Sequence, residues 1–191
     1  MQKQSELIVI GGANGSGKTT FAREFNIKFG FKYLGADEIA TKINERKPED
    51  AAIEAARLFS QKFGESLDKN ESLIVESTLS GVSLKKFLLR ARAEDFKISI
   101  YFVYLDSAEL CMKRIATRVA LGGHHVPAED VRRRFARSNK NFWNIYKQLV
   151  DYWNLFLNIG VNFQQIAAGD SAGIIIFDEA RYQEWLKMAT N

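Results

Sequence analysis

A glycine-rich segment near the N-terminus constrains this chain more than any other feature. Residues 12–19 read Gly-Ala-Asn-Gly-Ser-Gly-Lys-Thr and match the pattern G-x-x-x-x-G-K-[ST] at every required position. The segment follows an apolar run at 7–10, typical of a buried strand, and precedes a stretch with helical spacing. This context predicts a P-loop that wraps the phosphates of a nucleoside triphosphate.

Each part of this loop has a separate chemical task. Glycines let successive backbone N–H groups point inward at the phosphates, and the following helix N-terminus adds partial positive charge. Lys18 is predicted to reach the outer phosphates, and the Thr19 hydroxyl to coordinate Mg²⁺. The predicted nucleotide-binding residues are therefore Gly12, Ala13, Asn14, Gly15, Ser16, Gly17, Lys18, Thr19 and Thr20. The motif indicates ATP or GTP with Mg²⁺, and it does not identify a reaction.

Length and composition predict one globular domain over residues 1–191. The chain is 46% hydrophobic, and its two prolines leave no proline-rich linker. A polar N-terminus and the lack of an 18-residue apolar run argue against a signal peptide and a membrane span, so we expect a cytoplasmic protein. The net charge of +4 is too small to indicate nucleic-acid binding, although residues 111–147 hold nine Lys or Arg and only two acidic residues.

Hydrophobic periodicity predicts an α/β fold. Apolar runs at 7–10, 31–34, 73–75 and 98–105 alternate with helical patterns at 18–29, 37–45, 48–68, 82–93 and 107–119. Such alternation favours a parallel sheet with helices on both faces, the kinase-like arrangement of a P-loop NTPase. A long helix is then predicted over 128–157. Two apolar runs at 161–167 and 174–177 predict a C-terminal β-hairpin, followed by a helix ending near residue 188.

An ABC-type ATPase is one alternative that the P-loop leaves open. Residues 174–179 read IIIFDE, like a Walker B strand, and residues 79–81 read LSG, like part of a signature loop. In those ATPases the signature shortly precedes Walker B, whereas more than 90 residues separate the two segments here. We therefore interpret Asp178 as a helix cap after a hairpin strand.

Four segments in order along the chain carry a wider resemblance. They are the P-loop with Thr20, residues 35–40 (GADEIA), residues 76–80 (ESTLS), and residues 122–127 (GGHHVP) with 132–138 (RRRFARS). Together they resemble the zeta toxin family of P-loop kinases, over residues 6–158. The resemblance implies a kinase-like fold and phosphoryl transfer from ATP or GTP to a small hydroxyl-bearing acceptor. Some members phosphorylate the sugar 3′-hydroxyl of UDP-N-acetylglucosamine, and a small antitoxin protein is a candidate partner.

The resemblance also implies roles for three residues near the acceptor. Asp37 matches the family's catalytic aspartate and could accept a proton from the attacking hydroxyl, or it could simply be an N-cap. Glu76 matches an acidic position implicated in substrate or metal contact, with a solvated or capping glutamate as the alternative. Thr78 follows in the same loop as a further substrate-binding candidate. Ligands of open parallel sheets bind at the carboxyl ends of strands, where both Glu76 and Thr78 are predicted to lie.

A lid over residues 114–137 is predicted to supply the cationic groups. Arg118 ends the helix before the Gly-Gly loop, and Arg132, Arg133 and Arg134 follow that loop. Because neighbours on a helix point about 100° apart, the three adjacent arginines cannot all face one site. We rank Arg118 first, then Arg134, then Arg133, with Arg118 and Arg134 joining Lys18 and Asp37 as catalytic candidates and Arg133 as a nucleotide contact. His124 and His125 suit a lid better than a zinc site, because no matching Cys or acidic ligands accompany them.

Three departures from the family pattern limit what carries over. Ala13 replaces a usual proline, the lid is short, and residues 156–158 read FLN where related sequences tend to carry YDN, which leaves a base contact there open. Two other functions stay open as well. One is a nucleotide-dependent switch or binding protein with little turnover, and the other is an RNA-directed kinase that uses the basic 111–147 face.

Overall fold

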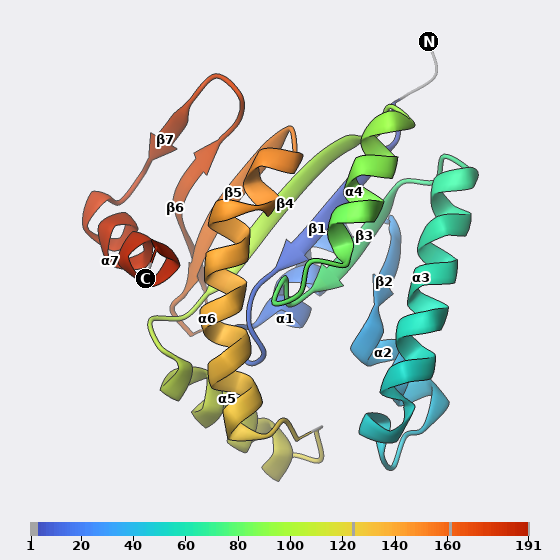
Figure 1. Cartoon of the computed structure of the whole chain (residues 1–191). Coiled ribbons are helices and arrows are strands. Elements are labelled where there is room, and N and C mark those ends of the chain that lie inside the picture. Colours follow the sequence, from blue (N-terminus) through green and yellow to red (C-terminus); the bar gives the residue numbers. More distant parts are fainter. Residues whose placement is uncertain (1–3, 124, 161, 191) are drawn as a thin grey trace.

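A seven-stranded sheet forms the centre of the molecule. The computed structural model describes residues 4–123, 125–160 and 162–190, and within them the strand order is β2-β3-β1-β4-β5-β6-β7 (Figure 1). β1 to β5 are parallel, and β6 and β7 are antiparallel additions at one edge. The strands are β1 (Glu6–Gly11), β2 (Lys32–Gly35), β3 (Leu73–Ser77), β4 (Lys97–Tyr104), β5 (Tyr152–Asn158), β6 (Phe163–Gly169) and β7 (Ile174–Ile176).

The helices alternate with the parallel strands as the sequence predicts. They are α1 (Lys18–Phe29), α2 (Ala36–Ile43), α3 (Ala52–Asp68), α4 (Leu84–Ala93), α5 (Ala108–Ala120), α6 (Ala128–Asn144) and α7 (Glu179–Thr190). Two 3₁₀ turns precede α3 and follow α6, at Pro48–Ala51 and Tyr146–Leu149. Among the described residues, no helix is both long enough and apolar enough to cross a membrane.

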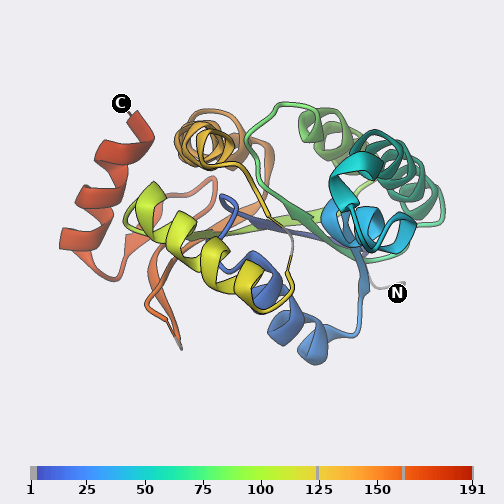
Figure 2. The ribbon, with the colours of Figure 1, turned by 90° about the horizontal axis from the view of Figure 1, so that it is seen from below.

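Both faces of the sheet are covered, but unequally. Alternate residues of β1 point to opposite faces, as the period of a strand requires. Leu7 and Val9 join the larger core formed with α3, α4, α6 and α7, whereas Ile8 and Ile10 pack against α1. Figure 2 shows α3, α4 and α6 on one side of the sheet and α1 and α5 on the other. The predicted α/β architecture is confirmed.

Strand order places the P-loop at a switch point of the sheet. β1 lies between β3 and β4, so the chain leaves it toward one side and later returns to the other. Ligands of open α/β sheets bind at the carboxyl ends of strands where this reversal occurs. The register pairs Gly11 with Ser77 and Gly35 with Glu76, so β1, β2 and β3 end together at this edge.

The predicted long helix over 128–157 is wrong in its second half. α6 ends at Asn144, and residues 152–158 form β5, which pairs in parallel with β4. Trp153, Leu155 and Leu157 alternate into the core, a period-two pattern that the surrounding apolar residues obscure in the sequence. Asp151 fixes the entry to the strand, because its Oδ2 accepts a 2.7 Å hydrogen bond from the N–H of Ile98.

The predicted C-terminal hairpin and the capping role of Asp178 are confirmed. β6 and β7 pair antiparallel, and Asp178 Oδ1 accepts a hydrogen bond of 3.0 Å from the N–H of Arg181 in the first turn of α7. β7 lies at the outer edge of the sheet, separated from β1 by β4, β5 and β6. Asp178 therefore follows a strand remote from the P-loop, which contradicts a Walker B interpretation.

Candidate functional site

Residues 12–19 form a cradle between β1 and α1, and Gly12 and Gly17 are among its positions that only glycine allows. Gly12 has φ 141°, and a Cβ there would lie 2.1 Å from the carbonyl oxygen of Val103. Gly17 has φ 100°, and a Cβ there would lie 2.2 Å from Nδ2 of Asn158. Both positions combine a left-handed backbone with close approach, as expected of a loop whose N–H groups turn inward.

Two polar side chains of this loop, Lys18 and Ser16, are buried and incompletely paired. Lys18 is 6% exposed, and its Nζ donates to the backbone oxygen of Ala13 at 2.9 Å. The Ser16 hydroxyl is fully buried and has no hydrogen-bond partner among the described residues. An ammonium with one fixed partner and an orphaned hydroxyl fit a bound phosphate, because buried polar groups otherwise cost free energy. Thr20 follows on the exposed side of α1.

Glu76 connects β3 to the P-loop. Its Oε1 accepts a hydrogen bond of 3.0 Å from the Thr19 hydroxyl and lies 3.9 Å from Lys18 Nζ. Its other oxygen, Oε2, accepts a hydrogen bond of 2.6 Å from the Tyr33 hydroxyl. Burial, together with the Glu76 carboxylate, raises the pKa of Tyr33 well above its ordinary value, so the hydroxyl keeps its proton and donates. Glu76 therefore lies beside the predicted metal ligand Thr19.

The oxygen atoms of Thr19 and Glu76 fit a magnesium ion. Mg²⁺ in nucleotide sites uses one or two carboxylates together with phosphate oxygens and retained waters. Within the described ranges, no group of three or more His, Cys, Asp or Glu side chains could hold a metal ion by itself. Thr19 and Glu76 would hold Mg²⁺ together with a nucleotide. His125 is exposed, and His124 lies outside the described residues. The lid role of the two histidines stays a prediction.

Asp37 lies in the first turn of α2, directly after the end of β2. Gly35 occupies the N-cap position of this helix, so the alternative interpretation of Asp37 as the N-cap is wrong. The side chain is exposed, and its charge contributes to the raised pKa of Tyr33, after the larger effects of burial, Glu76 and Glu38. Asp37 thus belongs to the same acidic edge as Glu76.

The three adjacent arginines of α6 point in different directions. Arg134 Nη1 lies 3.3 Å from Asn14 Oδ1 and donates to this P-loop side chain. Arg133 instead donates to Asp130 at 2.6 Å, and Arg132 lies 3.9 Å from Glu109. The structure therefore brings Arg134, and neither of its neighbours, to the phosphate loop. The separation follows from the angular spacing of residues on a helix.

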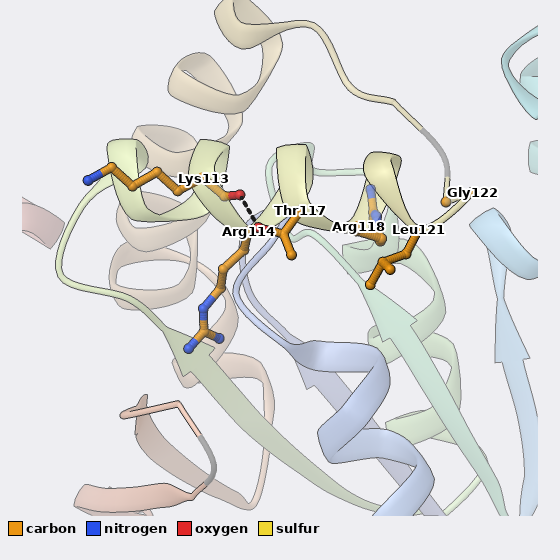
Figure 3. A pocket seen from close by; sticks show the side chains of 7 residues that line it. Lys113, Arg114, Thr117, Arg118, Leu121 and Gly122 are labelled. Carbon is orange, nitrogen blue, oxygen red and sulfur yellow. Dashed lines mark hydrogen bonds between the residues drawn. The ribbon is translucent and has the colours of Figure 1, made fainter.

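Arg118 lines a hollow beside α5. The hollow has a volume of about 540 Å³ and is lined by Lys113, Arg114, Thr117, Arg118, Leu121, Gly122 and Gly123. Figure 3 shows Arg114, Thr117 and Leu121 along the side of α5 that faces α1. This volume is within the usual range for small-molecule pockets, roughly 300–1,000 Å³.

Thr78 lies in a loop that α6 holds in place. Its backbone oxygen accepts a 2.5 Å hydrogen bond from Ser138, and the backbone oxygen of Leu79 accepts one of 2.9 Å from Asn141. Leu79 has φ 54°, an unusual left-handed conformation for a leucine, and its side chain is buried. Such strain persists only when surrounding contacts impose it, and it concentrates at functional sites. The loop therefore presents the Thr78 hydroxyl, which is hydrogen-bonded to Ser80, on a fixed backbone.

Comparison with known proteins places this site in a family. The family described as AAA domain matches residues 7–141, which include the P-loop, Asp37, Glu76 and Arg134. The chain belongs to this AAA domain family. An uncharacterised protein of Haemophilus influenzae is 32% identical over 132 residues, covering 69% of this chain and 94% of that protein. A cytidylate kinase of Archaeoglobus fulgidus is 26% identical over 158 residues, covering 78% of this chain and 81% of the kinase.

Solved structures share the fold of this AAA domain at low sequence identity. The AvrRxo1-ORF1:-ORF2 complex with ATP contains a chain with TM-score 0.78 and 15% identity, matched over 100% of the present chain. The present chain spans 66% of the length of that chain. The PezAT toxin–antitoxin system of Streptococcus pneumoniae gives TM-score 0.58 and 16% identity, with 82% of this chain and 69% of that chain covered. The fold is thus that of kinase-like P-loop proteins, and the matching family is the AAA domain rather than one described as zeta toxin.

Two residues that the sequence analysis did not assign support the AAA domain's P-loop from behind. Asn158, at the carboxyl end of β5, donates through Nδ2 to the backbone oxygen of Ser16 at 2.8 Å. Its Oδ1 accepts a hydrogen bond of 3.0 Å from Arg114 of α5. The altered triplet at 156–158 was the available signal, but the prediction of a helix there hid the position of Asn158 at a strand end. Through these bonds, β5 and α5 together fix the loop that holds the phosphates.

Asn158→Ala should weaken both the fold and nucleotide binding. It leaves the Ser16 carbonyl and the Arg114 guanidinium without their Asn158 partner, and an unsatisfied buried group costs about 1–3 kcal/mol. Thermal unfolding and ATP titration calorimetry would measure the two effects. Asn154→Ala on the same strand is the matched control, since Asn154 bonds to Gln165 and does not touch the loop. An Asn158→Ala variant with unchanged ATP affinity would contradict the supporting role.

Proposed function

We propose that this chain is a phosphotransferase that moves the terminal phosphoryl group of ATP or GTP to a small hydroxyl-bearing acceptor. One observation supports this above the others. The buried P-loop, the Thr19–Glu76 pair and Arg134 of α6 converge at the same edge of the sheet. Phosphoryl transfer depends on positioning and charge stabilisation more than on covalent chemistry by the protein. It therefore requires a phosphate cradle, an acid that holds the metal and a cation at the transferring group.

The proposed roles follow from the position and charge of each residue. The P-loop backbone and Lys18 bind and orient the phosphates, and Arg134 stabilises negative charge on the transferring group. When bound, Mg²⁺ neutralises charge on the outer phosphate oxygens, and Thr19 and Glu76 are the residues that would hold it. Asp37 accepts the proton of the acceptor hydroxyl as its oxygen attacks phosphorus.

The hollow beside α5 is the proposed place for the nucleoside half of the donor. Arg114 lines this hollow and bonds to Asn158, which in turn bonds to Ser16 of the P-loop, so the hollow adjoins the phosphate cradle. Arg118 lines the same hollow, and a guanidinium plane can stack on a base. We keep Arg118 as a nucleotide contact and lid arginine. Arg133 is a weaker candidate, because Arg133 and Arg134 both lie near Asp130 but, among the described residues, Arg134 is the one that also contacts Asn14.

UDP-N-acetylglucosamine is the proposed acceptor that the zeta toxin resemblance suggests, with Glu76 and Thr78 on its side of the site. The similarity to a cytidylate kinase supports a nucleoside monophosphate as the second candidate. The two acceptors need different chemistry. A hydroxyl must lose a proton to its base, whereas a phosphate oxygen is already ionised, so an exposed carboxylate at Asp37 favours the hydroxyl acceptor.

The other functions that the sequence left open receive less support. A nucleotide switch needs neither Asp37 nor Arg134 at the phosphate edge. An RNA-directed kinase would use the basic face of α6, but Arg132 and Arg133 there are near or bonded to Glu109 and Asp130, as on an ordinary solvated helix. A small antitoxin partner stays a prediction that fits the likeness to the PezAT toxin–antitoxin system. The expected cytoplasmic location also stays a prediction.

A transfer assay with labelled nucleotide tests this proposal directly. The purified chain would be incubated with γ-labelled ATP or GTP, Mg²⁺ and a panel of acceptors that includes UDP-N-acetylglucosamine, other nucleotide sugars and nucleoside monophosphates. Label appearing on an acceptor hydroxyl is the expected result. Label on a monophosphate would favour the cytidylate kinase alternative, and release of inorganic phosphate alone across the panel would favour the switch protein.

Arg134→Ala should reduce turnover far more than it reduces ATP affinity. Removing one preorganised donor to a developing charge costs about 100-fold in rate, and we expect the same pattern for Arg118→Ala. Initial rates and calorimetric ATP affinities would separate the two effects. Arg132→Ala is the matched control, because it removes the same charge from α6 at a residue that lies near Glu109 and leaves the contact of Arg134 with Asn14 intact. Equal losses of rate and affinity in Arg134→Ala would make it a ground-state contact instead.

A further inference from the structure

Tyr33 occupies a position in this site to which neither the P-loop motif nor the family resemblance assigns a role. It lies in β2, which the sequence predicted only as a weak strand, and its ring is half-buried against the α1 face of the sheet. Its hydroxyl donates to Glu76 Oε2 at 2.6 Å, the shortest of the hydrogen bonds that Glu76 accepts here. An aromatic residue that served packing alone would not need this bond.

The bond from Tyr33 gives Glu76 one fixed orientation. The two carboxylate oxygens have different partners, since Oε2 accepts from Tyr33 and Oε1 accepts from Thr19 at 3.0 Å. The Glu76 side chain is only 9% exposed, so water has little access to replace either partner. Holding one oxygen at Tyr33 directs the other toward the P-loop.

The backbone of β2 leaves room for the contact between Tyr33 and Glu76. Gly35 pairs with Glu76 across β2 and β3, and Tyr33 is two residues earlier on the same strand face. A Cβ at Gly35 would lie 2.8 Å from the Tyr33 hydroxyl oxygen. The ring therefore reaches Glu76 by passing over a position that has no side chain, and a larger residue at 35 would displace it.

We propose that Tyr33 is a positioning residue for a divalent cation, acting through Glu76. The inference rests on the proposed function, in which Thr19 and Glu76 hold Mg²⁺ beside the nucleotide phosphates. Groups that hydrogen-bond to metal-binding carboxylates fix the geometry of those ligands, and their loss typically costs about 10- to 100-fold in metal affinity or activity. Tyr33 donates to Glu76 Oε2, the oxygen that does not bond to Thr19. It can therefore fix the carboxylate while the other oxygen stays directed at the proposed cation.

The test compares the metal dependence of nucleotide binding in Tyr33→Phe and wild type. ATP affinity would be measured by calorimetry with EDTA and again across a Mg²⁺ or Mn²⁺ titration, which needs no turnover. We expect metal-free ATP affinity to stay within about twofold, while the metal concentration that supports tight binding rises about 10-fold. Tyr101→Phe is the matched control, because Tyr101 packs on the same α1 face and does not contact Glu76.

A second pair of measurements separates this inference from the proposed function. Glu76→Gln should lose the metal dependence outright. Metal dependence that is lost in Glu76→Gln but unchanged in Tyr33→Phe would overturn the role of Tyr33 and leave the phosphotransferase proposal standing. A Tyr33→Phe variant that raises only the KM for the acceptor would also overturn it, by showing that Tyr33 orients Glu76 toward the acceptor. If wild-type ATP binding shows no metal dependence at all, the proposed function itself fails.

Discussion

Lys18→Ala should lower the affinity for ATP by about 10³-fold while the chain stays folded. Lys18 is predicted to make charge-assisted hydrogen bonds to two outer phosphates, and each such bond contributes about 1.5–3 kcal/mol. No neighbouring cation on the P-loop can replace it, because Arg134 approaches through Asn14 from another helix. Titration calorimetry with Mg²⁺ and ATP would measure the loss.

The structure also says what the Lys18 variant should not change. Among the described residues, Lys18 donates to the Ala13 carbonyl and lies 3.9 Å from Glu76, so its removal breaks no hydrogen bond between strands of the sheet. Circular dichroism and thermal unfolding should therefore show a folded chain. Lys140→Ala, an exposed lysine of α6, removes the same charge away from the loop and should leave ATP affinity unchanged. Unaltered ATP affinity in a folded Lys18→Ala variant would refute the P-loop assignment.

The alternation of strands and helices was predictable because most elements have one clear hydrophobic period. β1, β3 and β4 each contain a run of buried apolar residues, and the helices between them show apolar residues at helical spacing. β5 was not predictable in the same way. Trp153, Leu155 and Leu157 face one core while Phe156 faces the other, so apolar residues occur on both sides and the period disappears. No glycine or proline separates this strand from α6 to mark the break.

The candidate site likewise has a part that the sequence predicted and a part that it did not. The P-loop is local, so its spacing alone predicted a phosphate loop between a buried strand and a helix, as the structure has it between β1 and α1. The contacts that complete the site join residues far apart in sequence, such as Tyr33 with Glu76 and Ser16 with Asn158. Those contacts depend on strand order and register, which the sequence pattern did not determine. The sequence ranked Arg134 above Arg133, but only the structure shows the contact of Arg134 with Asn14 and the bond of Arg133 to Asp130.

Asp37→Asn should abolish most phosphoryl transfer while nucleotide binding survives. The amide keeps the size of the side chain and removes its basicity, and general-base catalysis contributes about 10²- to 10⁴-fold. We expect a rate loss of about 10³-fold, measured as label moved from ATP to the acceptor. ATP affinity should stay close to that of wild type, because Asp37 belongs to α2 and not to the phosphate loop.

Glu38→Gln makes the Asp37 result interpretable. Glu38 is the next residue of α2, forms an ion pair with Lys42 on the same helix, and loses the same charge when changed to glutamine. An acidic side chain in the first turn of a helix adds about 0.3–1 kcal/mol through the helix dipole, so both variants should lose a similar small amount of thermal stability. Only Asp37→Asn should lose transfer. If both variants lose transfer equally, the negative charge at the start of α2 is what matters and Asp37 is not the base. If neither variant loses transfer, the acceptor is an anion that needs no base, as in the cytidylate kinase alternative.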